Sequence, residues 1–297
     1  MSDDKSLKDI VDSLIEERKS DKKFKFLTRS IFFIFIIFIV ISITLSTTEN
    51  INQTNKHVAV VEVTGMISSA GPVNPDVILP HIKKAVKNDN CVGIILKINS
   101  PGGSATQSKI IFDEIKKIRL TTDKKIYAVI DDVGASGGYY IAASADKIFS
   151  SSSSIVGSIG VRLDSFNISR LMDKLGVDSQ TLSSGKDKTM LDPFSPLTAE
   201  HRIHLERLLK NIHNQFIQDI ESSRGDKIKK DVFTGLFWTG VEARKIGLID
   251  DLLSTYDVSE KFFNDNPLIV YNKERDIIKE LLNSSLSIHN TIFGISY

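Results

Sequence analysis

The sequence predicts an α/β protein in which helices flank both faces of a mostly parallel sheet, preceded by one N-terminal transmembrane helix. Three observations lead to this fold class. Short apolar stretches alternate with helical stretches between residues 57 and 150, two glycine-rich turns follow apolar stretches, and a long uncharged segment lies near the N-terminus. Alternating strands and helices are typical of a parallel sheet that is covered on both faces.

The composition is that of an ordinary globular protein. The chain has 297 residues, of which 41% are hydrophobic and 25% charged, so it can bury a sizeable core. A net charge of +1 gives no reason to expect nucleic acid as a partner. The single cysteine, Cys91, excludes an intramolecular disulfide, and the apolar run after it predicts that it is buried. The histidines show no metal-binding spacing, so we expect neither a metal nor a cofactor.

The uncharged segment 30–48 predicts a membrane anchor. As a helix it would span about 28 Å, close to the 30 Å hydrocarbon core of a bilayer. A cleaved signal peptide is the alternative, but a long polar stretch precedes the segment and only a weak cleavage site, 44–46, follows the apolar core. Basic residues crowd the region before the segment, and none follows it until Lys56. The positive-inside rule therefore predicts a cytoplasmic N-terminus and places the rest of the chain across the membrane.

The elements after the linker follow from hydrophobic periodicity. Apolar stretches predict strands at 57–65, 91–98, 125–131 and 147–150, and helical spacing predicts helices at 76–87, 104–120, 136–145 and 198–225, with a short helix and a terminal strand within 238–252. Thr198 and Gly225 are suited to begin and end the longest helix. Both glycine-rich turns, 100–104 and 134–138, follow predicted strands, where parallel sheets form their sites.

Ser136 lies in the second turn, between a buried strand and a helix of small residues. A serine at this position is most often only a helix N-cap. However, Gly137 lacks a side chain, so its N–H can approach a reacting carbonyl, and a helix N-terminus favours negative charge. We therefore expect Ser136 to be a nucleophile with Gly137 as one oxyanion donor. Gly102 or Gly103 would be the second donor, unless their turn is only a turn.

A nucleophilic serine needs a base. No histidine lies between Ser136 and His201. The other option is a lysine that is neutral because burial lowers its pKa. The candidates are Lys147, Lys174, Lys186 and Lys188, and composition does not choose among them. Each would otherwise be an ordinary surface lysine.

Five sequence blocks carry a resemblance to a known family. They read INSPGGSA, GASGGYYIAASADKIFSS, IVGSIGV, LSSGKDKTMLDPFSP and WTGVEARKIGLIDD. In this order and spacing the chain closely resembles, over about residues 57–255, the short single-domain signal peptide peptidases of the SppA family. These are Ser-Lys proteases of the Clp-protease/crotonase fold. The resemblance implies Ser136 as nucleophile, Lys188 as base with Lys186 as the fallback, Ser158 as the residue that orients the lysine, and Gly137, Gly103 and Gly102 as oxyanion donors.

The apolar segment and the resemblance together imply an organisation and a function. The expected parts are a cytoplasmic tail (1–29), a transmembrane anchor (30–48), a linker (49–56), a Ser-Lys peptidase domain (57–265) and a C-terminal extension (266–297). We expect a homo-oligomeric serine endopeptidase, anchored in the bacterial inner (cell) membrane with its catalytic domain outside the cytoplasm. It would degrade signal peptides left after preprotein processing, and other short hydrophobic peptides. The alternatives are a crotonase-like acyl-CoA enzyme and an inactive membrane scaffold of the same fold.

Overall fold

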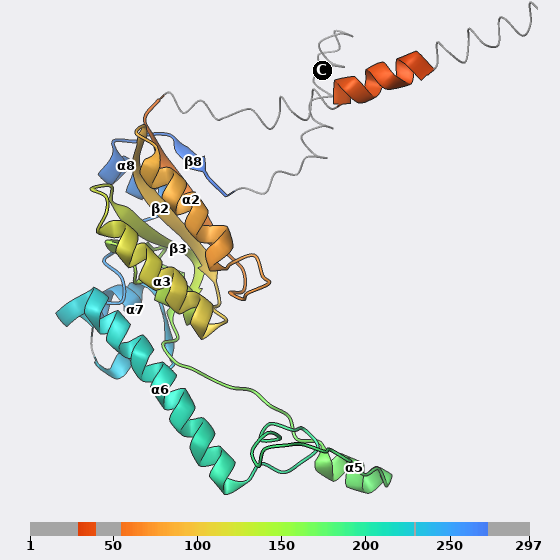
Figure 1. The fold of residues 1–297 in the computed structure, drawn as a ribbon. Helices are drawn as coiled ribbons and strands as arrows, with labels where there is room; N and C mark the ends of the chain where they lie inside the picture. Colours follow the sequence, from red (N-terminus) through yellow and green to blue (C-terminus); the bar gives the residue numbers. More distant parts are fainter. Residues whose placement is uncertain (1–28, 40–54, 229, 273–297) are drawn as a thin grey trace, which may run out of the picture. The chain divides into compact units, whose positions relative to one another are not determined.

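The computed structural model describes residues 29–39, 55–228 and 230–272 (Figure 1). The chain divides into two units, Met1–Thr54 and Asn55–Tyr297. In the first unit, residues 29–39 form a helix with exposed apolar side chains. This helix covers the beginning of the predicted anchor, whose remainder lies outside the described residues, as do the tail before it and most of the linker after it. Within the ranges described, no helix is long and apolar enough to cross a membrane.

The second unit is built on an eight-stranded sheet with the order β6-β5-β3-β2-β1-β8, in which β4 also pairs with β3, and β7 with β4. Every pair is parallel except the pair between β5 and β6. The mostly parallel α/β sheet predicted from the sequence is therefore confirmed. The strands are β1 His57–Thr64, β2 Cys91–Ser100, β3 Ile126–Ala135, β4 Lys147–Ser150, β5 Ile155–Gly157, β6 Phe237–Thr239, β7 Asp251–Leu252 and β8 Leu268–Val270.

Helices cover both faces of this sheet. Alternate residues of β1 enter different cores, Val61 on one face and Val60 on the other, because successive side chains of a strand point to opposite sides. The larger core includes residues of α2, α3, α4 and the end of α6, and the smaller core includes residues of α8. The helices are α2 Pro75–Lys87, α3 Ala105–Arg119, α4 Gly137–Ala142, α5 Ser169–Leu175, α6 Ala199–Arg224, α7 Gly240–Lys245 and α8 Thr255–Phe263, with short 3-10 turns at Gly225–Lys227 and Lys230–Val232.

Strand β3 changes partners along its length. Its first part pairs with β4, and its last three residues, Val133 to Ala135, pair with β5. Ser154 marks the change, because its hydroxyl donates to the carbonyl of Asp131. β3 is therefore longer than the predicted strand 125–131. Its extra residues carry the chain past β4 to the end of the sheet at which Ser136 precedes α4.

The ends of the unit add two observations. The Thr198 hydroxyl accepts a hydrogen bond from the His201 N–H at 3.2 Å, and Gly225 ends α6 with a φ of 57°, as the sequence predicted. Strand β8 pairs with β1 and lies just beyond the predicted limit of the peptidase domain at residue 265. The sheet thus continues into the segment predicted as a C-terminal extension, of which residues 273–297 lie outside the described ranges.

Candidate active site

Ser136 occupies a strained junction between β3 and α4. Its φ of 51° and ψ of −120° form a backbone conformation that residues other than glycine seldom adopt and that tends to occur at functional sites. Its N–H donates to the Gly157 carbonyl at 2.8 Å, which holds the turn against the neighbouring strand. The hydroxyl makes no capping bond to the helix that it precedes. Ser136 is therefore not a side-chain N-cap, and its half-buried oxygen is available for chemistry.

The two glycine-rich turns meet at this junction. A Cβ placed on Gly102 would lie 2.8 Å from both the Gly137 nitrogen and the Ser136 Cβ, so only a glycine permits this approach. The φ of Gly102, 100°, also favours glycine. Gly137 is the first residue of α4, and its N–H is one of those that a helix leaves unsatisfied at its start. The contact thus puts the first glycine turn beside an amide suited to bind an anion.

Hydrogen bonds decide which amide of the first turn is free. The Ile67 N–H donates to the Gly102 carbonyl at 2.9 Å, and the Ser104 N–H donates to the Ile67 carbonyl at 2.8 Å. In this parallel bridge the N–H of Gly103 points away from Ile67. The Gly102 N–H is buried and donates to the Ser100 hydroxyl at 3.2 Å. Of the three predicted oxyanion donors, Gly103 and Gly137 have no partner for their N–H among the described residues, whereas Gly102 is already engaged.

Ser158 lies next to Ser136 across the sheet. β5 pairs with the end of β3 so that Gly157 is opposite Ala135, and each serine is the next residue along its strand. Paired strands lie about 4.8 Å apart. Ser158 also has a positive φ, 52°, and its N–H donates to the Leu236 carbonyl at 2.7 Å. The sheet therefore brings together the predicted nucleophile and the serine predicted to orient the base.

The four candidate lysines differ in their surroundings. The Lys147 ammonium lies over the ring of Phe262, 4.8 Å from its centroid. The Lys186 ammonium lies 3.3 Å from the carboxylate of Glu200. Lys174, on α5, and Lys188 are exposed, and the Lys188 amine has no hydrogen bond or ion pair with any described residue. The predicted base is thus unengaged, whereas its neighbour in the same loop is paired.

The single chain does not bring Lys188 to the nucleophile. Its loop is tied to the start of α6, where His201 Nε2 lies 3.0 Å from Asp187 Oδ1. Nearer its other end α6 packs on α4, where the Phe216 ring stacks on Tyr140 with centroids 4.2 Å apart. The helix rises about 22 Å between these two contacts at 1.5 Å per residue. The loop that carries the predicted base therefore lies beside the start of α6, whereas the predicted nucleophile precedes α4, which packs on the second half of α6.

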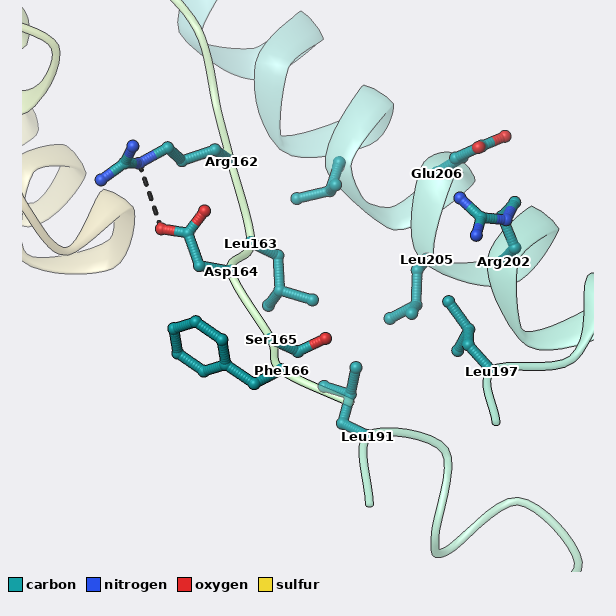
Figure 2. Close-up of a pocket in the computed structure, with 11 residues that line it drawn as sticks. Arg162, Leu163, Asp164, Ser165, Phe166, Leu191, Leu197, Arg202, Leu205 and Glu206 are labelled. Carbon is teal, nitrogen blue, oxygen red and sulfur yellow. Dashed lines mark ion pairs between the residues drawn. The ribbon is translucent and has the colours of Figure 1, made fainter. Parts of the chain in front are cut away.

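The segment 161–198 that carries Lys188 contains no buried residue. A hollow of about 630 Å³ lies between this segment and α6, and none of the predicted site residues lines it (Figure 2). Leucines from both elements surround the hollow, beside an ion pair of 3.3 Å between Arg162 and Asp164. The exposed apolar side chains of the segment are Leu163, Phe166, Ile168, Leu171, Leu175, Val177, Leu182, Leu191, Phe194 and Leu197. Four of these side chains line the hollow, and the apolar face as a whole stays exposed.

Sequence reasoning missed Ser100, which holds the Gly102 N–H. The signal was available, because a serine ends an otherwise apolar strand immediately before the first glycine turn. Burial of a hydroxyl at such a position requires hydrogen-bond partners, and the structure supplies two of them.

Comparisons with known proteins identify the family of this chain. Residues 118–265, which include Ser136, Ser158 and Lys188, match the family model of Peptidase family S49. A putative protease of Synechocystis sp. is 32% identical over 210 residues, which cover 70% of this chain and 74% of that protein. The chain belongs to peptidase family S49, the SppA family.

Other relatives of this S49 chain cover different shares of their own length. A putative signal peptide peptidase SppA of Enterococcus faecium is 30% identical over 235 residues, which are 74% of the S49 chain and 68% of the relative. The Na(+)/H(+) antiporter NhaA of Brucella abortus is 39% identical over 186 residues, which are 62% of the S49 chain. This match spans only 25% of the antiporter's length.

Proposed function

We propose that this S49 chain is a serine endopeptidase with Ser136 as its nucleophile. The observation that carries the proposal is the uncapped Ser136 hydroxyl where the first glycine turn meets the start of α4, since the Gly103 and Gly137 N–H groups of these two segments have no partner among the described residues. Ser136 Oγ would bond to the peptide carbonyl carbon while its proton passes to a base. The carbonyl oxygen, now negative, would accept hydrogen bonds from both amides. The C–N bond then breaks, the amine leaves with the proton, and water releases the acyl group.

Lys188 of a second copy of the chain is the proposed base. Two observations support a second copy: the Lys188 amine has no partner among the described residues, and an exposed apolar face surrounds its loop. A neighbouring copy would cover that face and bring the amine to Ser136. The Ser158 hydroxyl, beside the nucleophile, would hold the amine in place. The proposed enzyme is thus a homo-oligomer with a Ser-Lys dyad and needs no metal or cofactor.

The proposed substrates are signal peptides left after preprotein processing, and other short hydrophobic peptides. The apolar segment 30–48 supports a location at a bacterial cell membrane, and the basic residues before it support a cytoplasmic N-terminus. The peptidase domain, 57–265, would then lie outside the cytoplasm, where such peptides are released. The name of the Enterococcus faecium relative is consistent with this substrate class.

Covalent labelling tests the nucleophile. The full chain in membranes is treated with a fluorophosphonate, which a reactive serine attacks at phosphorus with loss of fluoride. Labelling is expected for the wild-type chain and for Ser144→Ala, a buried serine at the end of α4, and not for Ser136→Ala. An acyl-CoA enzyme could use the two amides on a thioester without a covalent serine, and an inactive scaffold would use neither. Labelling that persists in Ser136→Ala, or is absent from the wild type, would refute the proposal.

Protease accessibility tests the location. Protease added to intact spheroplasts is expected to digest the domain or the linker 49–56. Protection in spheroplasts combined with digestion in inverted vesicles would reverse the proposed topology without affecting the assignment of Ser136.

A further inference from the structure

Ser100 connects three segments that form the candidate site. It ends β2 and is completely buried. Its hydroxyl donates to the Gly65 carbonyl at 2.6 Å and accepts from the Gly102 N–H at 3.2 Å. The end of β1 is thereby joined, through one side-chain oxygen, to the glycine turn that follows β2.

The third segment is the start of α4. A Cβ placed on Gly138 would lie 2.6 Å from the Ser100 carbonyl oxygen and 3.2 Å from its Cβ. Gly138 is the second residue of α4, directly after Gly137. Ser100 therefore supports both sources of the proposed oxyanion donors, the turn that carries Gly103 and the helix start that carries Gly137.

The hydroxyl restrains a turn that would otherwise have several conformations. Gly102 and Gly103 have φ values of 100° and 147°, and glycine explores such regions as readily as negative φ. The hydrogen bond from the Gly102 N–H holds this amide against the Ser100 hydroxyl at the end of β2. Because the following N–H points away from Ile67, the same restraint exposes the Gly103 amide.

We infer that Ser100 is a positioning residue for the oxyanion site, whose hydroxyl holds Gly102 so that the Gly103 N–H is presented to the reacting oxygen. This inference rests on the proposed function. It separates the two neighbouring glycines: Gly102 is an anchor and Gly103 a donor. Loss of the hydroxyl would leave the buried Gly102 N–H and the half-buried Gly65 carbonyl without this partner, and the turn would reorient.

A pair of inhibitors distinguishes positioning from general stability. In an apolar tripeptide aldehyde, acetyl-Leu-Leu-leucinal, Ser136 Oγ would bond to the aldehyde carbon. The π pair would move to oxygen in the oxyanion site, and the serine proton would pass to the base. The corresponding tripeptide alcohol fills the same subsites without forming this bond. The ratio of the two inhibition constants, measured on full-length oligomeric protein, therefore reports the oxyanion site.

Ser100→Ala is expected to raise the inhibition constant of the aldehyde about tenfold or more, since removal of a single oxyanion donor costs up to about 10³ in rate. The inhibition constant of the alcohol should stay within about twofold of its wild-type value, because the alcohol forms no oxyanion and does not use the oxyanion site. The control is Ser144→Ala, which removes another fully buried hydroxyl bonded to a backbone carbonyl and should change neither constant. If Ser100→Ala does not fold, Ser100→Cys, a weaker hydrogen-bonding group at the same place, should shift the ratio in the same direction.

The inference is overturned if Ser100→Ala keeps the wild-type ratio of the two inhibition constants, whether both constants stay unchanged or both rise by the same factor. Failure of the proposed function has a different signature: the wild-type protein would bind the aldehyde no more tightly than the alcohol, which would overturn both.

Discussion

Ser136 and Ser158 occupy equivalent positions on neighbouring parallel strands, one residue beyond the paired residues Ala135 and Gly157. Both have a positive φ, 51° and 52°, and the Ser136 N–H is bonded to the carbonyl of the residue before Ser158. Strained backbone conformations and the carboxyl ends of parallel strands are both typical of functional sites, and these two serines combine them. Their strain is the source of the first prediction.

Ser136→Gly should stabilise the protein while abolishing fluorophosphonate labelling. Glycine adopts the φ and ψ of this position without steric cost, so the free energy of unfolding is expected to rise by about 1 kcal/mol. Ser136→Ala also removes the nucleophile but keeps a Cβ, and should bring no such gain. Urea unfolding of the three proteins measures the difference. A destabilised Ser136→Gly would mean that the strain is not stored at this residue.

Ser158→Ala should weaken catalysis less than Lys188→Ala. The serine would only orient the amine, so we expect a loss of about tenfold in kcat/KM, against about 10²–10⁴ for removal of the base. Lys186→Ala is the matched control and should retain activity, since its ammonium is paired with Glu200. Loss of activity in Lys186→Ala alone would identify the other lysine as the base.

Mixing two inactive variants should restore activity. Ser136→Ala supplies an intact lysine and Lys188→Ala an intact serine, so a site between two copies is complete when each contributes its intact residue. Random coassembly should give about a quarter of wild-type activity if every site lies between neighbouring copies. The variants are coexpressed and assayed against each variant alone. No recovery in verified mixed oligomers would place both residues of each site in the same copy.

Gly137→Ala should be rescued in part by Ser108→Ala. A Cβ on Gly137 would lie 2.3 Å from the Ser108 hydroxyl oxygen, and its next neighbours are 3.0 Å and 3.4 Å away. The single change is expected to destabilise the protein by about 1–3 kcal/mol through overpacking, and removal of the hydroxyl should recover part of this loss. A double-mutant cycle of unfolding free energies measures the coupling. Additive effects would show that the clash is relieved elsewhere.

Acid should destabilise the fold through Asp250. Burial would raise the pKa of Asp250, but hydrogen bonds from Arg224 at 2.7 Å and Lys227 at 2.8 Å hold this pKa below its ordinary value. A carboxyl with a lower pKa in the folded state stabilises it above its unfolded pKa of about 3.9, and this contribution is lost as pH falls through the folded value.

Asp250→Asn should therefore cost about 3–5 kcal/mol at neutral pH, because it leaves the buried Arg224 without the negative charge that it faces. It should also flatten the fall in unfolding temperature below about pH 4. Glu114→Gln removes a half-exposed carboxylate paired with Lys117 at the surface and should change the unfolding temperature little. If the unfolding temperature of Asp250→Asn fell with pH as steeply as that of the wild type, other groups would be responsible for the acid sensitivity.

Much of the fold could be predicted because the information is local. The long apolar strands β1 and β2 and the amphipathic helices α3 and α6 are encoded in the spacing of their own residues. Strands β5, β6 and β8 have three residues each, too few for periodicity, and exist because neighbouring strands offer unpaired backbone groups. The same local reading found Ser136, since a glycine turn after a buried strand is visible in the sequence.

The arrangement within the site depended on contacts between distant segments. The sequence alone determined the α/β class, the apolar segment 30–48 and the chemistry available at Ser136. It could not distinguish Gly102 from Gly103, because the choice depends on the bonds of Ser100 to Gly65 and Gly102. Nor could it separate Lys188 from the nucleophile, because the length and direction of α6 decide where that loop lies. Residue types and their spacing are properties of the chain, whereas the direction of an N–H and the reach of an amine exist only after distant segments have packed together.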